Sequence, residues 1–178
     1  RLDNLSQGTL TLESYQYLGA GTVVERAHPQ SGIKLTYIKQ GGEGDGEAGD
    51  PYAGLDRFGR VVDQRWYRVS DGGSPDRYIY TYDRGSNVAT KYNWAACHSP
   101  YAPENYTVTY AYDGLGRLTQ AYNDGTYCSE QTFALDAVGN ITGVGTGGQT
   151  TYRQSNALNQ LVATGTDGSA VRSKDFTG

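Results

Sequence analysis

Four aspartates recur at similar intervals and are the first residues to consider for chemistry: Asp56, Asp83, Asp113 and Asp136. Carboxylates can act as general acid and base or as metal ligands, and a glycosidase needs two of them within about 10 Å in one cleft. Each aspartate here opens a short polar, glycine-containing stretch typical of a tight turn, where the carboxylate accepts a backbone hydrogen bond. One aspartate per turn would spread the carboxylates along an edge. We therefore interpret them as turn residues and predict no metal site.

Two other groups could suggest chemistry. Residues 41–50 form an acidic, glycine-rich run, but calcium loops need oxygen ligands at fixed offsets, and no EF-hand spacing is present. This run is predicted to be a solvated loop. Cys97 precedes His98 directly, which could indicate a nucleophile and its base. Adjacent residues of a strand point to opposite faces, however, so we predict no catalytic residue, no cofactor and no enzyme activity.

The aspartates mark an internal repeat, which decides the interpretation of the whole chain. Residues 112–118 (YDGLGRL) are echoed by three close copies, at residues 55–61, 82–88 and 135–141. Weaker copies lie at residues 17–23 and 155–161. The sequence thus predicts six units, with turns near positions 18, 56, 83, 113, 136 and 156.

The residues before each mark alternate as in a β-strand. Between residues 106 and 112, one predicted face carries Tyr106, Val108, Tyr110 and Tyr112. The chain has 16 Tyr and 25 Gly but three Phe and no Met, which favours a sheet cut by turns. We expect an all-β fold of antiparallel hairpins in series.

The third residue after each mark is predicted to adopt a positive φ, as a type I turn followed by a bulge requires. Glycine occupies this position in four units: Gly21, Gly59, Gly116 and Gly139. Ser86 and Asn159 replace it in the other two units, and Ser86 is a departure from the pattern.

Charge and hydropathy exclude two classes of partner. The net charge is -4 without a run of Lys or Arg, so we predict no nucleic-acid binding. No apolar stretch approaches the roughly 18 residues of a membrane span.

The pattern Tyr-Asp-x-x-Gly-Arg/Asn-aliphatic resembles the YD repeat of the RHS family. That family includes bacterial RHS and wall-associated proteins, shell subunits of insecticidal toxin complexes, and teneurins. The resemblance covers about residues 15–163 and is strong at the four aspartate-marked units. Residues 54–66 also resemble YD-repeat proteins of planctomycete-type bacteria.

The resemblance implies a curved antiparallel sheet of consecutive hairpins within a larger hollow shell. We expect residues 1–178 to be one such segment, a fragment of a larger secreted or cell-surface protein, with neighbouring repeats as its partners. The implied function is a structural segment of a shell that encloses a C-terminal effector. The family's self-cleavage motif is absent from this sequence, so autoproteolysis is not carried over.

Alignment of the repeats also gives the two cysteines a role. Cys97 lies 14 residues after Asp83, and Cys128 lies 15 residues after Asp113. These near-equivalent places in consecutive hairpins predict a Cys97–Cys128 disulfide and an oxidising compartment.

Two alternative functions remain open. Trp66 and Trp94 could stack on sugar rings or contact a receptor, which would make the chain an adhesin module; alternatively, the rings pack on the sheet. Exposed strand edges could instead pair with other copies and build an extracellular filament.

Overall fold

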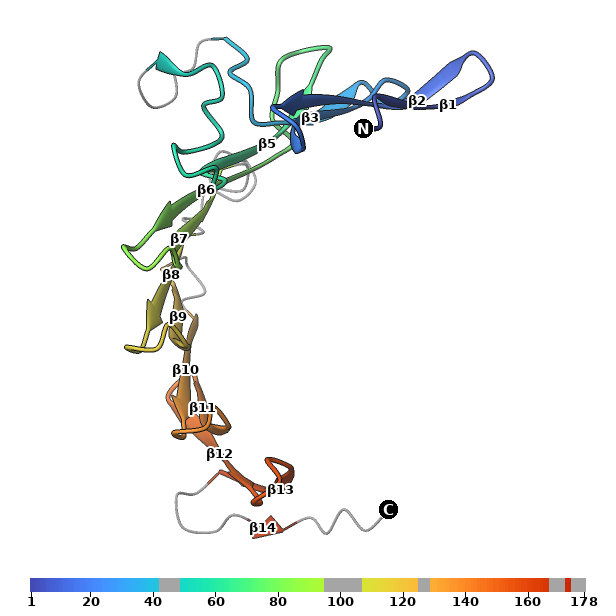
Figure 1. Cartoon of the computed structure of the whole chain (residues 1–178). Helices are drawn as coiled ribbons and strands as arrows, with labels where there is room; N and C mark the ends of the chain where they lie inside the picture. The colour runs from blue at the N-terminus through green and yellow to red at the C-terminus, as the bar shows by residue number, and fades with distance from the viewer. Residues whose placement is uncertain (42–48, 95–106, 125–128, 167–171, 174–178) are drawn as a thin grey trace. The chain divides into compact units, whose positions relative to one another are not determined.

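The computed structural model describes residues 1–41, 49–94, 107–124, 129–166 and 172–173. These residues form fourteen strands in one open antiparallel sheet, and the strand order follows the chain (Figure 1). The strands are β1 (Asn4–Gln7), β2 (Leu10–Leu18), β3 (Thr22–His28), β4 (Ile33–Thr36), β5 (Asp63–Arg68), β6 (Asp76–Tyr82), β7 (Val88–Asn93), β8 (Thr107–Tyr112), β9 (Leu118–Asn123), β10 (Ser129–Leu135), β11 (Ile141–Thr146), β12 (Gln149–Ser155), β13 (Leu161–Gly165) and β14 (Arg172–Ser173). The predicted all-β fold of antiparallel hairpins is confirmed.

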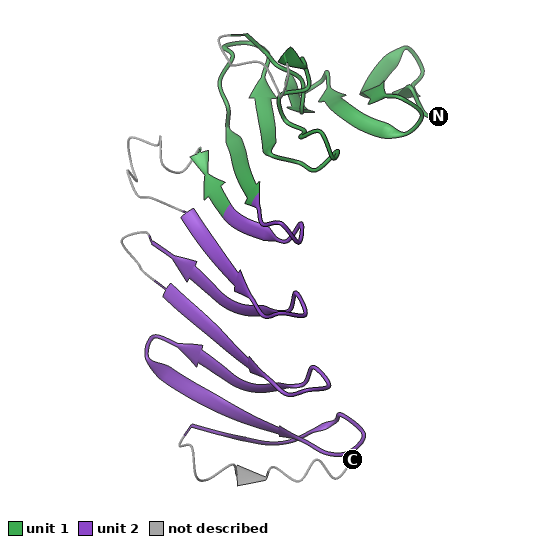
Figure 2. Ribbon diagram, turned by 60° about the vertical axis from the view of Figure 1, so that its left-hand side comes forward, with its two compact units in different colours: residues 1–81, 91–106 green, residues 82–90, 107–178 purple. Residues whose placement is uncertain are grey.

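The chain divides into two compact units (Figure 2). Unit 1 comprises residues 1–81 and 91–106, and unit 2 comprises residues 82–90 and 107–178. The β6–β7 hairpin therefore contributes its base to unit 1 and its turn to unit 2. Among the described residues, no helix is long and apolar enough to span a membrane.

The best-buried part of unit 1 lies where β3 meets β4 and the loop that follows β4. Val24 and Thr36 are each 1% exposed. The Tyr37 backbone N–H donates to the Val24 carbonyl at 2.9 Å, so β3 continues to hold the chain beyond β4. Glu25 is also buried, where the Lys34 Nζ lies 2.8 Å from its Oε2. Burial of this carboxylate is thereby matched by a cation on the neighbouring strand.

The sequence repeat marked by Asp56 differs from a full hairpin. A single bridge, Leu55 to Val61, closes its turn, and residues 50–54 are not a strand. Pro51 cannot donate to a strand ladder, which disfavours pairing of this segment. The segment docks through Gly54, whose N–H donates to the Tyr37 carbonyl at 2.9 Å.

The first predicted turn also differs in detail. The prediction that Gly21 adopts a positive φ was wrong, because Gly19 adopts it instead, with φ of 61°. Leu18 pairs with Thr22, which leaves a loop of three residues. Leu18 offers no carboxylate to hold the backbone two and four residues further on, so the turn that the aspartates form cannot be built here.

Unit 2 contains three regular hairpins, β8–β9, β10–β11 and β12–β13. Each has a register shift directly before its turn, between Ala111 and Tyr112 in the first of them. At the opposite edge, Gly147 and Gly148 join β11 to β12, with φ of 58° and 79°. Two consecutive positive φ values match the two-residue hairpin loop that follows the twist of the strands. This turn was not predicted from the sequence.

Candidate functional site

The turn at Asp113 shows how the repeat closes each hairpin. Its Oδ1 accepts hydrogen bonds from the backbone N–H groups of Leu115 at 2.9 Å and Arg117 at 3.0 Å. The Asp113 N–H donates to the Arg117 carbonyl at 2.9 Å, and the Gly116 N–H donates to the Asp113 carbonyl at 2.9 Å. One carboxylate oxygen thus satisfies two backbone donors that the turn would otherwise leave without protein acceptors.

The same geometry recurs along the chain. Oδ1 of Asp56, Asp136 and Asn156 accepts from the N–H groups two and four residues later, at 2.8–3.1 Å. Asp83 Oδ1 accepts from the Asn87 N–H at 2.9 Å. The third residue after the mark has a positive φ in each of these turns, including Ser86 at 65° and Asn159 at 61°. The turn geometry therefore persists where glycine is replaced.

The second carboxylate oxygen binds the side chain four residues later, a pairing that the sequence analysis missed. Arg60 Nε and Arg117 Nε each lie 2.6 Å from Oδ2 of their aspartate. Asn140 and Asn87 donate to the equivalent oxygens at 2.8 Å and 2.9 Å.

The last turn reverses this hydrogen bond. Asn156 Nδ2 donates to the Gln160 Oε1 at 2.9 Å, so an amide donor at the mark is matched by an acceptor four residues later. The signal was present in the sequence, because the donor or acceptor type at this spacing matches the mark in all five turns.

These contacts hold the carboxylates in the charged form. Hydrogen bonds from the Arg117 backbone and side chain lower the pKa of Asp113. The Asn140 side chain, with nearby backbone N–H groups, lowers the pKa of Asp136. Burial opposes the shift at Asp56, but hydrogen bonds from Arg60 and Phe58 outweigh it, so its pKa is also lowered. A lowered pKa suits a carboxylate with a structural role. A general acid needs a raised pKa instead.

Side chains also connect neighbouring turns of unit 2. Arg117 Nη1 donates to the Asp136 carbonyl at 2.8 Å, and Asn140 Nδ2 lies 3.0 Å from the Asn159 Oδ1. The Tyr112 hydroxyl donates to the Val88 carbonyl of the preceding hairpin at 2.9 Å. These hydrogen bonds connect one repeat to the next along the edge of the sheet where the turns lie, which we call the turn edge.

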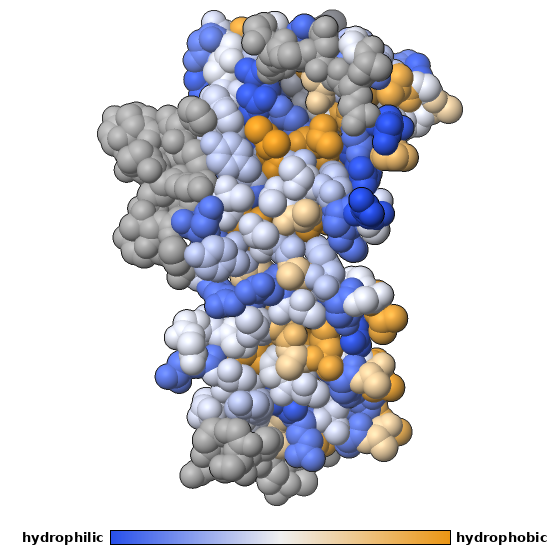
Figure 3. Space-filling model, turned by 90° about the vertical axis from the view of Figure 1, so that its left-hand side faces the viewer, coloured by the Kyte–Doolittle hydropathy of each residue, from blue (hydrophilic) through white to orange (hydrophobic). Residues whose placement is uncertain are grey.

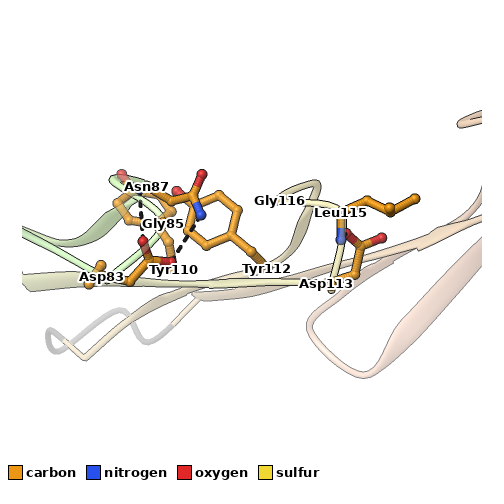
Figure 4. Close-up of a pocket in the computed structure, with 10 residues that line it drawn as sticks. Asp83, Gly85, Asn87, Tyr110, Tyr112, Asp113, Leu115 and Gly116 are labelled. Atoms are coloured by element: carbon orange, nitrogen blue, oxygen red, sulfur yellow. Dashed lines mark hydrogen bonds between the residues drawn. The ribbon is translucent and has the colours of Figure 1, made fainter.

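A cavity of about 610 Å³ opens between the turns marked by Asp83 and Asp113 (Figure 4). Tyr110, Tyr112 and Leu115 contribute to its lining. Both carboxylates bind donors of their own turns. The cavity therefore does not offer the pair of carboxylates that acid–base chemistry needs.

A second cavity, of about 330 Å³, lies beside Trp66 in unit 1. Its lining includes His28 at the end of β3 and Asp76 at the start of β6, which is the cross-strand partner of Trp66. The His28 and Trp66 rings are stacked, with centroids 6.0 Å apart and an interplanar angle of 23°. Three strands thus bring an indole, an imidazole and a carboxylate to one opening.

Glu13 lies close to His28. Its Oε1 lies 2.7 Å from Arg26 Nη2 and 3.6 Å from His28 Nδ1, and Tyr15 donates its hydroxyl hydrogen to Oε2. The hydrogen bonds from Arg26 and then Tyr15 lower the pKa of Glu13 to about 2. The Glu13 carboxylate is therefore charged at neutral pH, and it lies near the imidazole that stacks on Trp66.

Trp94, the other candidate for sugar stacking, is placed differently. The Arg77 guanidinium carbon lies over its ring, 5.2 Å from the centroid. Arg77 is itself held by Asp63, at 2.5 Å between Nη2 and Oδ2. A cation that an ion pair fixes in place covers one face of this indole. The structure does not bring Trp94 into the lining of the cavity beside Trp66.

Several predicted features lie outside the described residues. These are Cys97, His98 and Cys128, together with residues 42–48 of the acidic run. In the part of the chain that the structure describes, no three His, Cys, Asp or Glu side chains are grouped closely enough to hold a metal ion.

Comparison with solved structures shows what this fold resembles. The crystal structure of TcdB2-TccC3-Cdc42 matches 85% of this chain, with a TM-score of 0.63 and 19% identity. The crystal structure of TcdB2-TccC3-TEV matches 88%, with a TM-score of 0.60 and 20% identity. A mutant Tc holotoxin pore of Photorhabdus luminescens matches 90%, with a TM-score of 0.55 and 16% identity.

The chain spans only 8% to 10% of the length of these toxin-complex chains. No protein-family model matches it, and a search of curated proteins finds no significant match. At this level of identity, the structural matches establish the fold and leave the activities of the larger complexes unassigned here. The chain has the RHS-like fold of serial antiparallel hairpins that also forms part of these Tc toxin chains.

Proposed function

We propose that this chain is a non-catalytic wall segment of a secreted or cell-surface RHS-type shell, in which its hairpins line up side by side. The observation that carries the proposal is the turn edge of unit 2, where the same turn geometry recurs and side-chain hydrogen bonds connect each turn to the next. Such a sheet can be extended at both ends by further hairpins of the same kind, as repeat architectures are.

The burial pattern supports a wall. Among the described residues, the buried hydrophobic ones are Val24, Leu55 and Ala163, and most strand side chains are half-buried. A single sheet with so little core gains stability from neighbouring repeats, because each hairpin repeat alone cannot bury enough apolar area. Partners in the proposed shell are therefore the adjoining repeats of a longer chain.

The proposal includes an enclosed effector at the C-terminal end of the longer protein. Its support is the fold shared with chains of Tc toxins, one of them from a Tc holotoxin pore. A protease-protection assay on the full-length protein tests it: the C-terminal segment should survive trypsin under native conditions and be digested after denaturation. The same segment expressed alone is the control. Equal digestion of the segment in both contexts would contradict enclosure.

A second candidate function is carbohydrate binding beside Trp66, favoured by the cavity that this indole shares with His28 and Asp76. A sugar would place its apolar ring face on an aromatic side chain and its hydroxyls on the imidazole and carboxylate. A glycan array carrying neutral oligosaccharides tests this candidate.

Variants of both tryptophans sharpen that test. Trp66→Ala should abolish any array signal, whereas Trp94→Ala should keep it, because Trp66 lines this cavity and Trp94 does not. An array without signal, or a signal that survives Trp66→Ala, would eliminate carbohydrate binding at this cavity.

A further inference from the structure

Side chains bridge two junctions between neighbouring turns of unit 2. Arg117 spans the first: its Nε lies 2.6 Å from the Asp113 Oδ2, and its Nη1 donates to the Asp136 carbonyl at 2.8 Å. Asn140 spans the second, with its Nδ2 2.8 Å from the Asp136 Oδ2 and 3.0 Å from the Asn159 Oδ1. Both bridges start from the residue four positions after the mark.

The junction between the turns marked by Asp83 and Asp113 is built differently. Asn87 holds the position of the bridging residue, but its Nδ2 donates back to the Asp83 Oδ2 at 2.9 Å (Figure 4). Within the part of the chain that the structure describes, Asn87 makes no hydrogen bond to the next turn. Its amide is shorter than an arginine side chain, and Gly116 of that turn has no side chain to meet it. The cavity of about 610 Å³ lies at this junction.

The backbone carbonyl of Asp113 has room for a second hydrogen bond. The Asp136 carbonyl accepts two, from the Gly139 N–H at 3.2 Å and from Arg117. Among the described residues, the Asp113 carbonyl accepts only the Gly116 N–H, at 2.9 Å. A carbonyl oxygen has two lone pairs, so this one can take another donor. Because the two turns are equivalent, that donor would approach from the preceding turn, where the cavity lies.

The rest of the lining suits both the stem and the charge of an arginine. Tyr110, Tyr112, Ala89 and Leu115 contribute apolar surface, on which a methylene stem can pack. A guanidinium is attracted to the face of a tyrosine ring, and the carboxylate of Asp83 in the lining favours a cation. On the face of unit 2 drawn in Figure 3, hydrophilic residues lie beside apolar ones, a mixture that matches such a side chain.

We propose that this cavity binds the guanidinium group of an arginine presented by another polypeptide. The bound guanidinium donates to the Asp113 carbonyl, as Arg117 donates to the Asp136 carbonyl one hairpin later. A lysine is a poorer ligand, because its ammonium is a strongly hydrated point charge without a planar fork of donors. The volume of about 610 Å³ is typical of ligand sites and exceeds what a guanidinium group fills, so the residues that flank the arginine also have room.

An NMR titration of the isotope-labelled chain tests the proposal. The probe is the blocked tripeptide acetyl-Gly-Arg-Gly-amide, and acetyl-Gly-Lys-Gly-amide is its control. The arginine peptide should shift the backbone N–H signals of residues 113–116 with a Kd of about 1 mM. The lysine peptide should bind at least about tenfold more weakly. Methylguanidinium, which lacks the stem and the flanking residues, should also bind at least about tenfold more weakly.

Two variants with the same added charge locate the site. Asn87→Arg fills the cavity from within the chain, as Arg117 bridges the next junction, so it should fold and no longer respond to the arginine peptide. Leu158→Arg adds its charge at an exposed position of a turn further along the chain and should keep the native affinity. The dispersion of each NMR spectrum reports folding.

Any of four results would overturn the inference. The first is the absence of shifts up to about 20 mM arginine peptide, and the second is equal binding of the lysine peptide. The third is an Asn87→Arg chain that unfolds or keeps the native affinity, because the turns would then not be equivalent. The fourth is loss of binding in Leu158→Arg. Equal affinity for methylguanidinium would assign the cavity to a free guanidinium compound and overturn the protein-borne arginine. None of these outcomes depends on the proposed shell role.

Discussion

Exchanging the hydrogen-bonding types of Asp56 and Arg60 should restore a turn that either single change weakens. Asp56→Asn keeps an acceptor for the backbone but turns an amide donor toward Arg60 Nε, which now lies 2.6 Å from Oδ2. Adding Arg60→Gln reproduces the pair already present between Asn156 and Gln160. The double variant should therefore be more stable than Asp56→Asn alone.

The structure sets the expected magnitudes. The Asp56 side chain is only 6% exposed and accepts from two backbone N–H groups and from Arg60. Asp56→Ala removes all three hydrogen bonds and should cost about 2–3 kcal/mol. Asp56→Asn should cost about 1.5 kcal/mol, and the double-mutant cycle should show a favourable coupling of about 1 kcal/mol.

Urea unfolding followed by tryptophan fluorescence measures these differences. The chain has two tryptophans, Trp66 and Trp94, and both belong to unit 1, as Asp56 does. Asp3→Ala is the control, because this side chain is 76% exposed and lies 3.8 Å from Arg1, so the midpoint should not move. A double variant no more stable than Asp56→Asn would refute the proposed pairing rule.

Gly54→Ala should lower the stability of unit 1 by about 2 kcal/mol or more, because a Cβ there would lie 2.5 Å and 2.7 Å from backbone atoms of two other segments; the same urea titration measures it. Ser86→Gly should raise stability by about 0.5–1 kcal/mol, since glycine adopts its φ of 65° without strain, and an unchanged or lower melting temperature would contradict this. Acid should destabilise the turns. The folded-state pKa values of Asp113 and Asp136 lie below their unfolded values, so their stabilisation is present above about pH 4 and lost as the pH falls through the lowered values. Melting temperatures from about pH 6 to pH 2 should therefore fall less in Asp113→Asn/Asp136→Asn than in the native chain.

Local interactions explain why the turns and the sheet could be predicted from the sequence. The contacts of a turn join residues at most four positions apart. The mark, the position with positive φ and the partner four residues later are therefore all visible in one short motif. Ser86 illustrates the strength of this constraint, because the turn imposes a φ of 65° even without glycine. Alternating side chains predict a strand on each side of the turn, and the recurrence of the motif predicts hairpins in series.

Contacts between distant residues could not be predicted in the same way. The cavity beside Trp66 also needs His28 and Asp76, and the strand order brings these three residues together from three parts of the sequence. A strand was expected before Asp56, but Gly54 instead lies close to Tyr37, and no local sequence pattern predicts this contact. Such features depend on packing, and repeat alignment does not encode packing.

The cross-link between Cys97 and Cys128 stays a prediction. Alkylation of the non-reduced protein, followed by mass spectrometry, should find both thiols blocked from the reagent and freed by reduction. Two alkylated thiols without reduction would contradict the cross-link and the oxidising compartment that it implies.

Electron cryo-microscopy of the full-length protein that carries this segment tests the wall proposal most directly. We predict a hollow particle in which the hairpins of residues 107–165 lie side by side in the wall, with the turns at Asp113, Asp136 and Asn156 along one edge. A solid globular particle, or a filament in which these hairpins enclose no interior, would contradict it.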